Sequence, residues 1–165
     1  MKETQYSKFI IHNSKKGFTL IELLVVISII GILSALIMSN FNSVRQRTRD
    51  AQRKSDLNQV KAALGMYHND NNLYPLTANF PSWGTVFNNP DNTSMVYMKI
   101  LPNDPAMDPV SGTPKYSYAS ANGTDYCLKA TLENGSDSSI ATSHARCSTS
   151  CNFGSAANVY AVCPD

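Results

Sequence analysis

The sequence has no proline before Pro75, no cysteine before Cys127, and a single charged residue, Glu22, within residues 17–44. Because proline breaks the interior of a helix, its absence permits one uninterrupted helix from the apolar run to about residue 70. The near-absence of charge leaves an apolar run over residues 18–38. About 21 residues are enough to cross a hydrocarbon core of about 30 Å as a helix.

The sequence also lacks a recognisable catalytic arrangement. Its three histidines, His12, His68 and His144, are widely separated, and none accompanies a motif that would make a serine or cysteine a nucleophile. We therefore expect a protein that is not an enzyme.

All four cysteines fall in the last 39 residues, and none forms the Cys-x2-Cys pair typical of zinc sites. An even number of cysteines downstream of a membrane-length segment favours disulfides in an oxidising compartment. Four cysteines allow three pairings. The strand-like runs around Cys127 and Cys163 favour a bond between these two, with the second bond joining Cys147 to Cys151.

Charge is distributed unevenly along the chain, whose formal net charge is +2. Residues 1–17 hold four lysines against one glutamate, residues 45–54 are strongly basic, and residues 55–165 are mildly acidic. The basic block invites a nucleic-acid interpretation, but it directly follows the apolar run and is interleaved with aspartates. We predict instead that its side chains reach the membrane interface and form ion pairs between subunits, so nucleic acid is not an expected partner. The basic residues of this block are Arg45, Arg47, Arg49, Arg53 and Lys54.

The apolar run is unlike a cleaved secretory signal or a plain membrane anchor. A secretory signal has a shorter apolar stretch that ends in an Ala-x-Ala-like site, and no such site follows Met38. A plain anchor fits the length but gives no reason for Glu22, since a carboxylate within a membrane segment is costly. It also does not explain the Gly17–Phe18 step directly after two lysines.

The segment Lys15-Lys16-Gly17-Phe18-Thr19-Leu20-Ile21-Glu22 resembles the class III signal of type IV prepilins and of the pseudopilins of type II secretion. The resemblance implies that a membrane prepilin peptidase removes residues 1–17 by cutting after Gly17, and that Phe18 is then N-methylated. Glu22 becomes the fifth residue of the mature chain, which is the acidic position of the family. Unlike many members, this chain has no proline near the end of the apolar half, which leaves open whether the helix loosens between Gly31 and Asn40 on assembly.

Cleavage would place an α-ammonium on Phe18 inside the membrane. In a staggered stack of subunits, Glu22 of one chain can meet Phe18 of another, so each buried charge gains a partner. Such a pair adds little net stability, but it can fix the register of an assembly. Small side chains in the same run permit close helix approach. These are Ser28, Gly31, Ser34 and Ala35.

A second resemblance lies further along the chain. Tyr74-Pro75 after the helix, the run Leu101–Pro105 and the Tyr116-Ser117-Tyr118 stretch are similar to the major, G-type pseudopilins and some related pilins. That group binds calcium in an acidic loop late in the chain. The corresponding region here offers only scattered carboxylates, so no cofactor is predicted and calcium is kept as an alternative. These carboxylates belong to Asp125, Glu133 and Asp137.

The expected fold is α+β. Residues 18–39 are expected to form a membrane or filament-core helix, which continues as an amphipathic helix over 40–72. Residues 73–165 are expected to form a loop-and-sheet domain. The apolar face of the amphipathic helix includes Val44, Leu57, Val60, Leu64 and Tyr67. Three strands are predicted, Tyr116–Ser120, Asp125–Glu133 and Asn158–Cys163, with a hairpin at Asn122-Gly123. The second strand alternates, with Tyr126, Leu128, Ala130 and Leu132 expected to point inward and Cys127, Lys129, Thr131 and Glu133 outward. A short helix is expected near Trp83–Asn88 or Met95–Ile100. Residues 134–157 are expected to be loose without the disulfides.

These features predict a structural subunit of a type IV pilus, and the alternatives are a major pseudopilin of type II secretion or a minor tip pilin acting as adhesin or DNA receptor. The expected partners are other copies of the chain, the prepilin peptidase and methyltransferase, and an inner-membrane assembly platform. Before assembly the chain would cross the inner membrane once, with its leader in the cytoplasm. After assembly it would lie in an extracellular pilus or a periplasmic pseudopilus. The sequence does not decide between motility, adhesion, DNA uptake and secretion.

Overall fold

The computed structural model describes residues 17–106, 116–154 and 157–164. The chain divides into two compact units, residues 1–41 and 42–165, and helix α1 (Leu20–Asn71) contributes to both. The predicted α+β class, with a long N-terminal helix and a small antiparallel sheet, is confirmed. Residues 1–16 of the predicted leader lie outside the described residues.

The second half of α1 buries one face in the 42–165 unit. The buried positions recur every three or four residues, as expected for one stripe of an α-helix. Val44, which the sequence placed on this face, is 57% exposed, so the stripe begins only at Asp50. The stripe consists of Asp50, Arg53, Asp56, Leu57, Val60, Ala63, Leu64 and Tyr67.

The helix ends within the polar run His68–Asn72, one residue before the predicted end at 72. Asn72 follows α1 with a φ of 57° and donates its backbone N–H to the His68 carbonyl at 2.8 Å. Asparagine tolerates this left-handed conformation better than most residues, so Asn72 closes the helix as glycine does elsewhere.

A three-stranded antiparallel sheet packs on this stripe, in the order β3 (Tyr116–Ala119), β4 (Cys127–Thr131) and β5 (Val159–Val162). The three predicted strands are confirmed, although each is shorter than expected. Along β4 and its flanks, Tyr126, Leu128, Ala130 and Leu132 are buried, as their alternation predicted.

The turn between β3 and β4 contains the predicted Asn122-Gly123 pair. Gly123 has a φ of 77°, and a Cβ at this position would lie 2.9 Å from the Tyr74 carbonyl oxygen. Glycine is therefore required here both by the backbone conformation and by the close approach of the chain that leaves α1.

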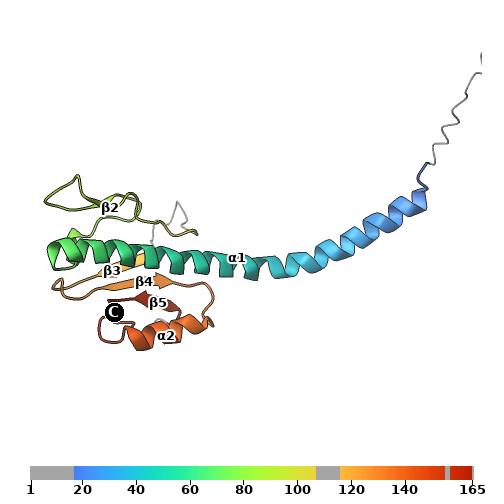
Figure 1. Ribbon diagram of the computed structural model, residues 1–165. Coiled ribbons are helices and arrows are strands. Elements are labelled where there is room, and N and C mark those ends of the chain that lie inside the picture. The colour runs from blue at the N-terminus through green and yellow to red at the C-terminus, as the bar shows by residue number, and fades with distance from the viewer. Residues whose placement is uncertain (1–16, 107–115, 155–156, 165) are drawn as a thin grey trace, which may run out of the picture. The chain divides into compact units, whose positions relative to one another are not determined.

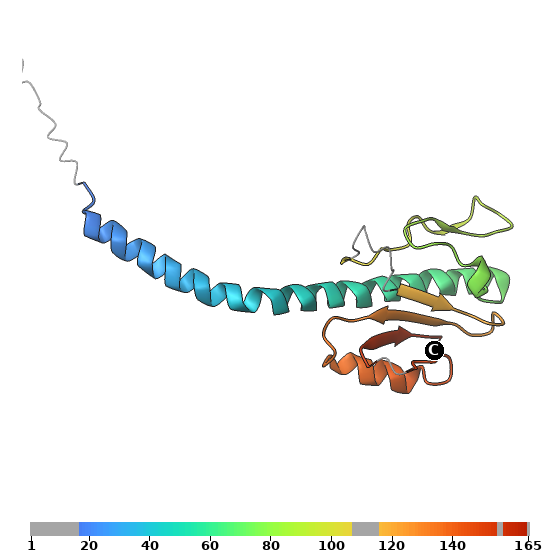
Figure 2. The ribbon, with the colours of Figure 1, turned by 180° about the vertical axis from the view of Figure 1, so that it is seen from behind.

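Helix α2 (Ser138–Arg146) covers the face of the sheet opposite α1 (Figures 1 and 2). The sequence did not predict this helix, which lies in the stretch 134–157 that was expected to be loose without the disulfides. The Asp137 carboxylate accepts a hydrogen bond from the Ser139 N–H at 2.9 Å and caps the helix, while Ile140 and Ser143 are buried beneath it. Because α2 covers this face, Cys127, expected to point outward, is only 3% exposed.

The connector after α1 holds a small hairpin where a short helix was predicted. After a 3-10 turn at Thr77–Asn79, strands β1 (Phe87–Asn88) and β2 (Val96–Met98) pair antiparallel. The predicted helix at Trp83–Asn88 or Met95–Ile100 is therefore wrong. The hairpin directs the Phe87 and Tyr97 rings onto Tyr67, with ring centroids 5.6 and 5.4 Å from it, which buries aromatic surface that a short exposed helix would leave in water.

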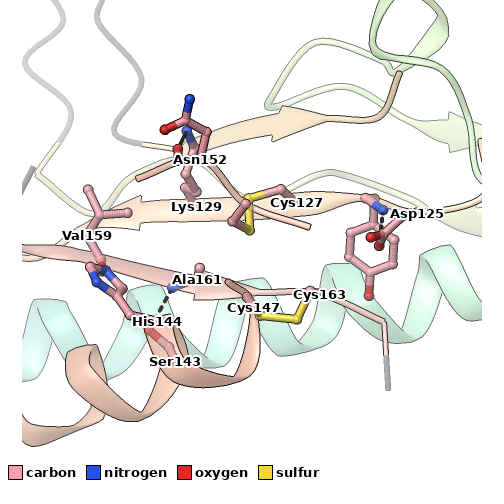
Figure 3. Close-up of a disulfide and its surroundings, with 12 residues drawn as sticks. Asp125, Cys127, Lys129, Ser143, His144, Cys147, Asn152, Val159, Ala161 and Cys163 are labelled. Carbon is pink, nitrogen blue, oxygen red and sulfur yellow. Dashed lines mark hydrogen bonds between the residues drawn. A yellow bond between two sulfur atoms is a disulfide. The ribbon is translucent and has the colours of Figure 1, made fainter. Parts of the chain in front are cut away.

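The two disulfides join Cys127 to Cys151 and Cys147 to Cys163 (Figure 3). The predicted pairing of Cys127 with Cys163, and of Cys147 with Cys151, is therefore wrong. The β4–β5 register pairs Leu128 with Val162, which places Cys127 and Cys163 close together at the ends of neighbouring strands, as expected. Each of them bonds instead to a cysteine just after α2, Cys163 to Cys147 and Cys127 to Cys151.

Candidate functional site

The head of the apolar helix is held by a reciprocal cap between Thr19 and Glu22. The Thr19 backbone N–H and hydroxyl donate hydrogen bonds to Glu22 Oε2 at 2.8 and 2.7 Å, and the Glu22 N–H donates to Thr19 Oγ1 at 3.3 Å. This is the capping-box arrangement, in which residues three apart satisfy the free N–H groups of the first turn. The cap fixes the position of the Glu22 carboxylate within the first turn of α1.

Phe18 and Gly17 precede this cap as a short non-helical segment. The Phe18 side chain is 92% exposed, and a Cβ built on Gly17 would meet no atom within 4 Å. The Gly17–Phe18 peptide bond is therefore accessible from several sides in the part of the chain that the structure describes.

The helix that follows exposes an apolar surface on all sides. Residues Leu20–Met38 form one helix that is long and apolar enough to cross a membrane, and none of that stretch is buried in the protein. The bulky side chains are about half exposed or more, from Leu20 at 81% to Val25 at 47%. A surface of this kind needs lipid or protein around it, since exposed apolar area is costly in water. Glu22 is the only charged residue within it.

A second cluster of charge lies within the 42–165 unit and is centred on the buried Arg53 side chain. Its guanidinium donates two hydrogen bonds to the Asp104 carboxylate, both at 2.9 Å, and others to Asp50 at 2.6 Å and Glu133 at 2.8 Å. Arg49 also binds Glu133 through two nitrogens, with the Nε–Oε1 distance at 2.7 Å. Asp50 in turn accepts hydrogen bonds from the backbone N–H groups of Glu133 and Asn134. The cluster thus ties α1 to the loop at Asp104 and to the end of β4.

Part of the basic block at 45–54 therefore binds carboxylates of its own chain, which differs from the role predicted from the sequence. Arg49, Arg53 and Lys54 form ion pairs within the chain, and Lys54 reaches Asp137 at 2.7 Å. The expectation that these three pair between subunits or at the membrane interface is wrong, because their partners lie in the globular part of the same chain. The sequence does contain a signal for ion pairs within the chain. The interleaved aspartates, Asp50 and Asp56, fall on the same helix face as Leu57 and Val60, which is the face expected to be buried.

Local charges and burial shift the pKa of several groups in this cluster. The hydrogen bond from Arg49, followed by that from Arg53, lowers the pKa of Glu133 to about 2. The bond from Lys54 and the cap contact with Ser139 lower the pKa of Asp137 to about 2. Burial, with the hydrogen bond to Asp56, raises the pKa of the Tyr116 hydroxyl, which stays protonated and donates to the Asp56 carboxylate.

We expect the globular unit to lose stability in acid. Both carboxylates have folded-state pKa values of about 2, below their ordinary values of 4.5 and 3.8, so their contribution is complete above pH 4.5 and is lost as pH falls towards 2. At about 1.4 kcal/mol per pKa unit, each contributes on the order of 2–3 kcal/mol. Urea unfolding of the full chain in detergent micelles at pH 7, 4 and 3 measures the loss. The Glu133→Gln and Asp137→Asn variants should show a flatter pH dependence, whereas Asp91→Asn, at an exposed position, should retain that of the wild type.

The carboxylates suggested as calcium ligands are occupied by cations or by backbone donors. Glu133 is bound by two arginines, Asp137 by Lys54, and Asp125 accepts from the Tyr126 N–H at 2.7 Å. In the described parts of the chain, no group of three or more His, Cys, Asp or Glu side chains is arranged to hold a metal ion. Arg53 places its positive charge among three carboxylates in the core, those of Asp50, Asp104 and Glu133.

We therefore expect chelation to leave the stability of the globular unit unchanged. Because the carboxylates already have cationic partners, removing calcium should not expose uncompensated negative charge. Melting curves of the full chain in detergent, recorded with excess EGTA and with millimolar calcium, should coincide. A rise of several degrees in the melting temperature on adding calcium would contradict this prediction.

A family model described as the prokaryotic N-terminal methylation motif matches residues 12–38, the part of the chain that includes Gly17, Phe18 and Glu22. Related proteins include the type II secretion system core protein G of Pectobacterium carotovorum subsp. carotovorum, 35% identical over 96 residues, which are 55% of this chain and 62% of that protein. The core protein G of Pseudomonas aeruginosa is 43% identical over 63 residues, 38% of this chain and 44% of that protein. The type IV wide pilus major component PilA4 of Thermus thermophilus is 48% identical over 59 residues, 36% of this chain and 45% of that protein.

The matched motif and these relatives support a place for the chain in the type IV pilin and pseudopilin family. The chain spans between 44% and 62% of the length of these three curated relatives. No solved structure shows significant similarity to it.

Proposed function

We propose that this chain is the structural subunit of a type IV pilus filament. A prepilin peptidase cuts after Gly17, Phe18 is N-methylated, and the mature chain is drawn from the inner membrane by an assembly platform into a helical polymer of identical copies. The observation that carries this proposal is a capped carboxylate, Glu22, in the first turn of a helix whose whole surface is apolar and exposed.

In this proposal Glu22 sets the position of each incoming subunit. The α-ammonium that cleavage creates on Phe18 is a charge in an apolar environment, and the Glu22 carboxylate of a neighbouring copy is its complement. A register that misaligns the two leaves both charges unpaired, which costs several kcal/mol for each ion. The apolar side chains of Leu20–Met38 then exchange lipid for neighbouring helices and form the core of the filament.

The proposed membrane topology follows from the positive charge of the leader and from the disulfides of the globular unit. The lysine-rich leader, including Lys15 and Lys16, stays in the cytoplasm, and the disulfide-containing unit lies outside the inner membrane, where disulfides form. After assembly the same unit forms the outer shell of an extracellular pilus.

A second candidate function is the major pseudopilin of a type II secretion system, whose filament stays in the periplasm. The match with core protein G of Pectobacterium favours it, because 96 residues exceed the length of the chain up to the end of α1 at Asn71. That similarity must therefore extend beyond the helix. Electron microscopy of surface filaments, with immunogold labelling of this chain, separates the two: extended labelled pili support the pilin, and labelled protein confined to the periplasm supports the pseudopilin. Sparse labelling at filament tips would contradict both and indicate a minor tip pilin.

Replacing Gly17 by valine should block processing. A prepilin peptidase that accepts only glycine before the cut would leave Gly17→Val with residues 1–17 attached, and mass spectrometry of the membrane fraction measures this directly. Because a Cβ at Gly17 meets no neighbouring atom, misfolding does not explain a block. Gly31→Ala is the matched control, since a Cβ at Gly31 also meets nothing and the variant should be cut normally. A Gly17→Val product lacking residues 1–17 would refute the cleavage assignment.

A further inference from the structure

The two disulfides of the globular unit are interleaved along the chain. The first cysteine bonds to the third, Cys127 to Cys151, and the second to the fourth, Cys147 to Cys163, with sequence separations of 24 and 16 residues. All four cysteines are buried, with exposed fractions of 5% or less. The native pairing therefore brings together cysteines that are not consecutive in the sequence.

The contact between α2 and β5 is what places these cysteines side by side (Figure 3). The Ala161 N–H donates to Ser143 Oγ at 3.2 Å, and His144 Nε2 lies 2.7 Å from the Val159 carbonyl oxygen. The chain continues from α2 through one further helical turn, in which the Cys151 N–H donates to the Cys147 carbonyl at 2.9 Å. Docking of α2 on the sheet thus sets Cys147 beside Cys163 and Cys151 beside Cys127.

Before α2 docks on the sheet, the lengths of chain between the cysteines favour non-native disulfides. Cys147 and Cys151 are only 4 positions apart, and Cys151 and Cys163 are 12 apart. If closure probability falls as the three-halves power of loop length, Cys147–Cys151 forms about 8 times more readily than Cys147–Cys163, and about 15 times more readily than Cys127–Cys151. In chain order, Cys127 also meets Cys147 before either native partner has entered the same compartment.

Each of the two wrong pairings uses all four cysteines. A chain that holds Cys147–Cys151 with Cys127–Cys163, or Cys127–Cys147 with Cys151–Cys163, has no free thiol with which to begin rearrangement. Thiol–disulfide exchange requires an attacking thiolate, so such a chain cannot reach the native pairing by itself.

We propose that this chain is a substrate of a thiol–disulfide isomerase, an enzyme with an accessible reactive dithiol, as well as of the thiol oxidase that first forms its bonds. The oxidase step transfers two electrons and two protons from two cysteines of the chain to the disulfide of the oxidase, once for each bond. In the isomerase step, an enzyme thiolate attacks a wrong disulfide and forms a mixed disulfide. The released cysteine thiolate then attacks the second wrong bond, and exchange continues until the enzyme thiolate is expelled, with no net transfer of electrons.

This proposal requires the oxidising compartment of the proposed function but does not depend on filament assembly. Refolding of the purified full chain therefore tests it. The reduced chain, unfolded in urea, is diluted into detergent micelles containing diamide, an oxidant that forms disulfides without reshuffling them. Excess oxidant is then removed, and the sample is divided between buffer with reduced glutathione and a disulfide isomerase, and the same buffer with an isomerase whose reactive cysteines are alkylated. Disulfide-linked peptides are assigned by tandem mass spectrometry, in which fragmentation between Cys147 and Cys151 distinguishes the pairings.

We expect the native pairs in at most about one third of the chains before isomerase is added, the share that random choice among three pairings gives. Active isomerase should raise this share about threefold, and the alkylated enzyme should convert the chain more slowly. Native pairing well above one third with diamide alone would overturn the proposal. So would a share that active isomerase raises no faster than the alkylated enzyme does.

A two-cysteine variant provides the matched control. Cys147→Ser with Cys163→Ser leaves only Cys127 and Cys151, which cannot mispair within a chain. Its oxidation should go to completion with diamide alone and should not respond to isomerase. A response of this variant would show that the enzyme acts on folding rather than on pairing, and would also overturn the proposal.

Discussion

Replacing Glu22 by alanine is expected to lower the yield of filaments by at least tenfold while the chain accumulates normally in the membrane. The variant leaves the Phe18 α-ammonium of each subunit without a partner in an apolar surrounding, at a cost of several kcal/mol, and about 1.4 kcal/mol already corresponds to a factor of ten. The loss of the Thr19–Glu22 cap costs only about 0.5–2 kcal/mol and affects the first turn of a 52-residue helix. Quantitative electron microscopy of sheared filaments, with immunoblots of the membrane fraction, measures both effects.

The controls for this prediction come from the same helix. Ser28 is a small polar residue whose hydroxyl donates to the Val25 carbonyl of its own helix at 2.7 Å, so Ser28→Ala should assemble as the wild type does. Glu22→Asp keeps the charge on a shorter side chain and should retain part of the yield. Filaments of Glu22→Ala in wild-type amounts would show that this carboxylate does not register the subunits.

Replacing Arg53 by alanine is expected to lower the free energy of unfolding of the globular unit by about 3–5 kcal/mol. The Arg53 side chain is fully buried, and its removal leaves the carboxylates of Asp50, Asp104 and Glu133 without their shared cation. Burial alone would lower the pKa of this guanidinium, but the bonds to Asp104, Glu133 and Asp50 raise it, so Arg53 is charged throughout the accessible pH range. Urea unfolding of the full chain in micelles, followed by fluorescence of Trp83, measures the change.

Two comparisons identify the origin of that loss. Arg47→Ala, on an exposed part of the same helix, should change the free energy of unfolding by less than about 0.5 kcal/mol. Combining Arg53→Ala with Asp104→Asn should cost less than the sum of the single variants, because the second substitution removes one of the stranded charges. Strict additivity of the two substitutions would contradict a direct interaction.

The sequence predicted the elements that have a strong period or a strong terminating signal. The spacing of Leu57, Val60, Leu64 and Tyr67 predicted the buried stripe of α1, and the alternation from Tyr126 to Leu132 predicted which face of β4 is buried. Both depend only on side-chain geometry along one element. The turn at Gly123 could be predicted equally well, since few residues other than glycine and asparagine adopt its backbone conformation.

The elements that were missed depend on contacts between distant parts of the chain. Helix α2 has nine residues, most of them small and polar, so its composition resembles a loop, and only the Asp137 cap and the spacing of Ile140, Ser143 and Cys147 indicated otherwise. The disulfide pairing in turn required knowledge of α2. The role of Arg53 could not be predicted, because its partners Asp104 and Glu133 lie 51 and 80 positions away and only the folded chain brings them together.

The charged cluster also determines how the globular unit responds to mechanical tension along α1. Force that enters this unit along the helix passes residues 42–48, which are exposed, and first meets the ion pairs of Arg49, Arg53 and Lys54. The apolar contacts from Leu57 to Tyr67 follow. From Arg49 to Tyr67 the contacts extend over about 27 Å of helix and lie side by side along its axis, so they resist the pull in shear rather than opening one at a time. The salt bridges and the apolar contacts therefore share a load that is applied along the helix axis.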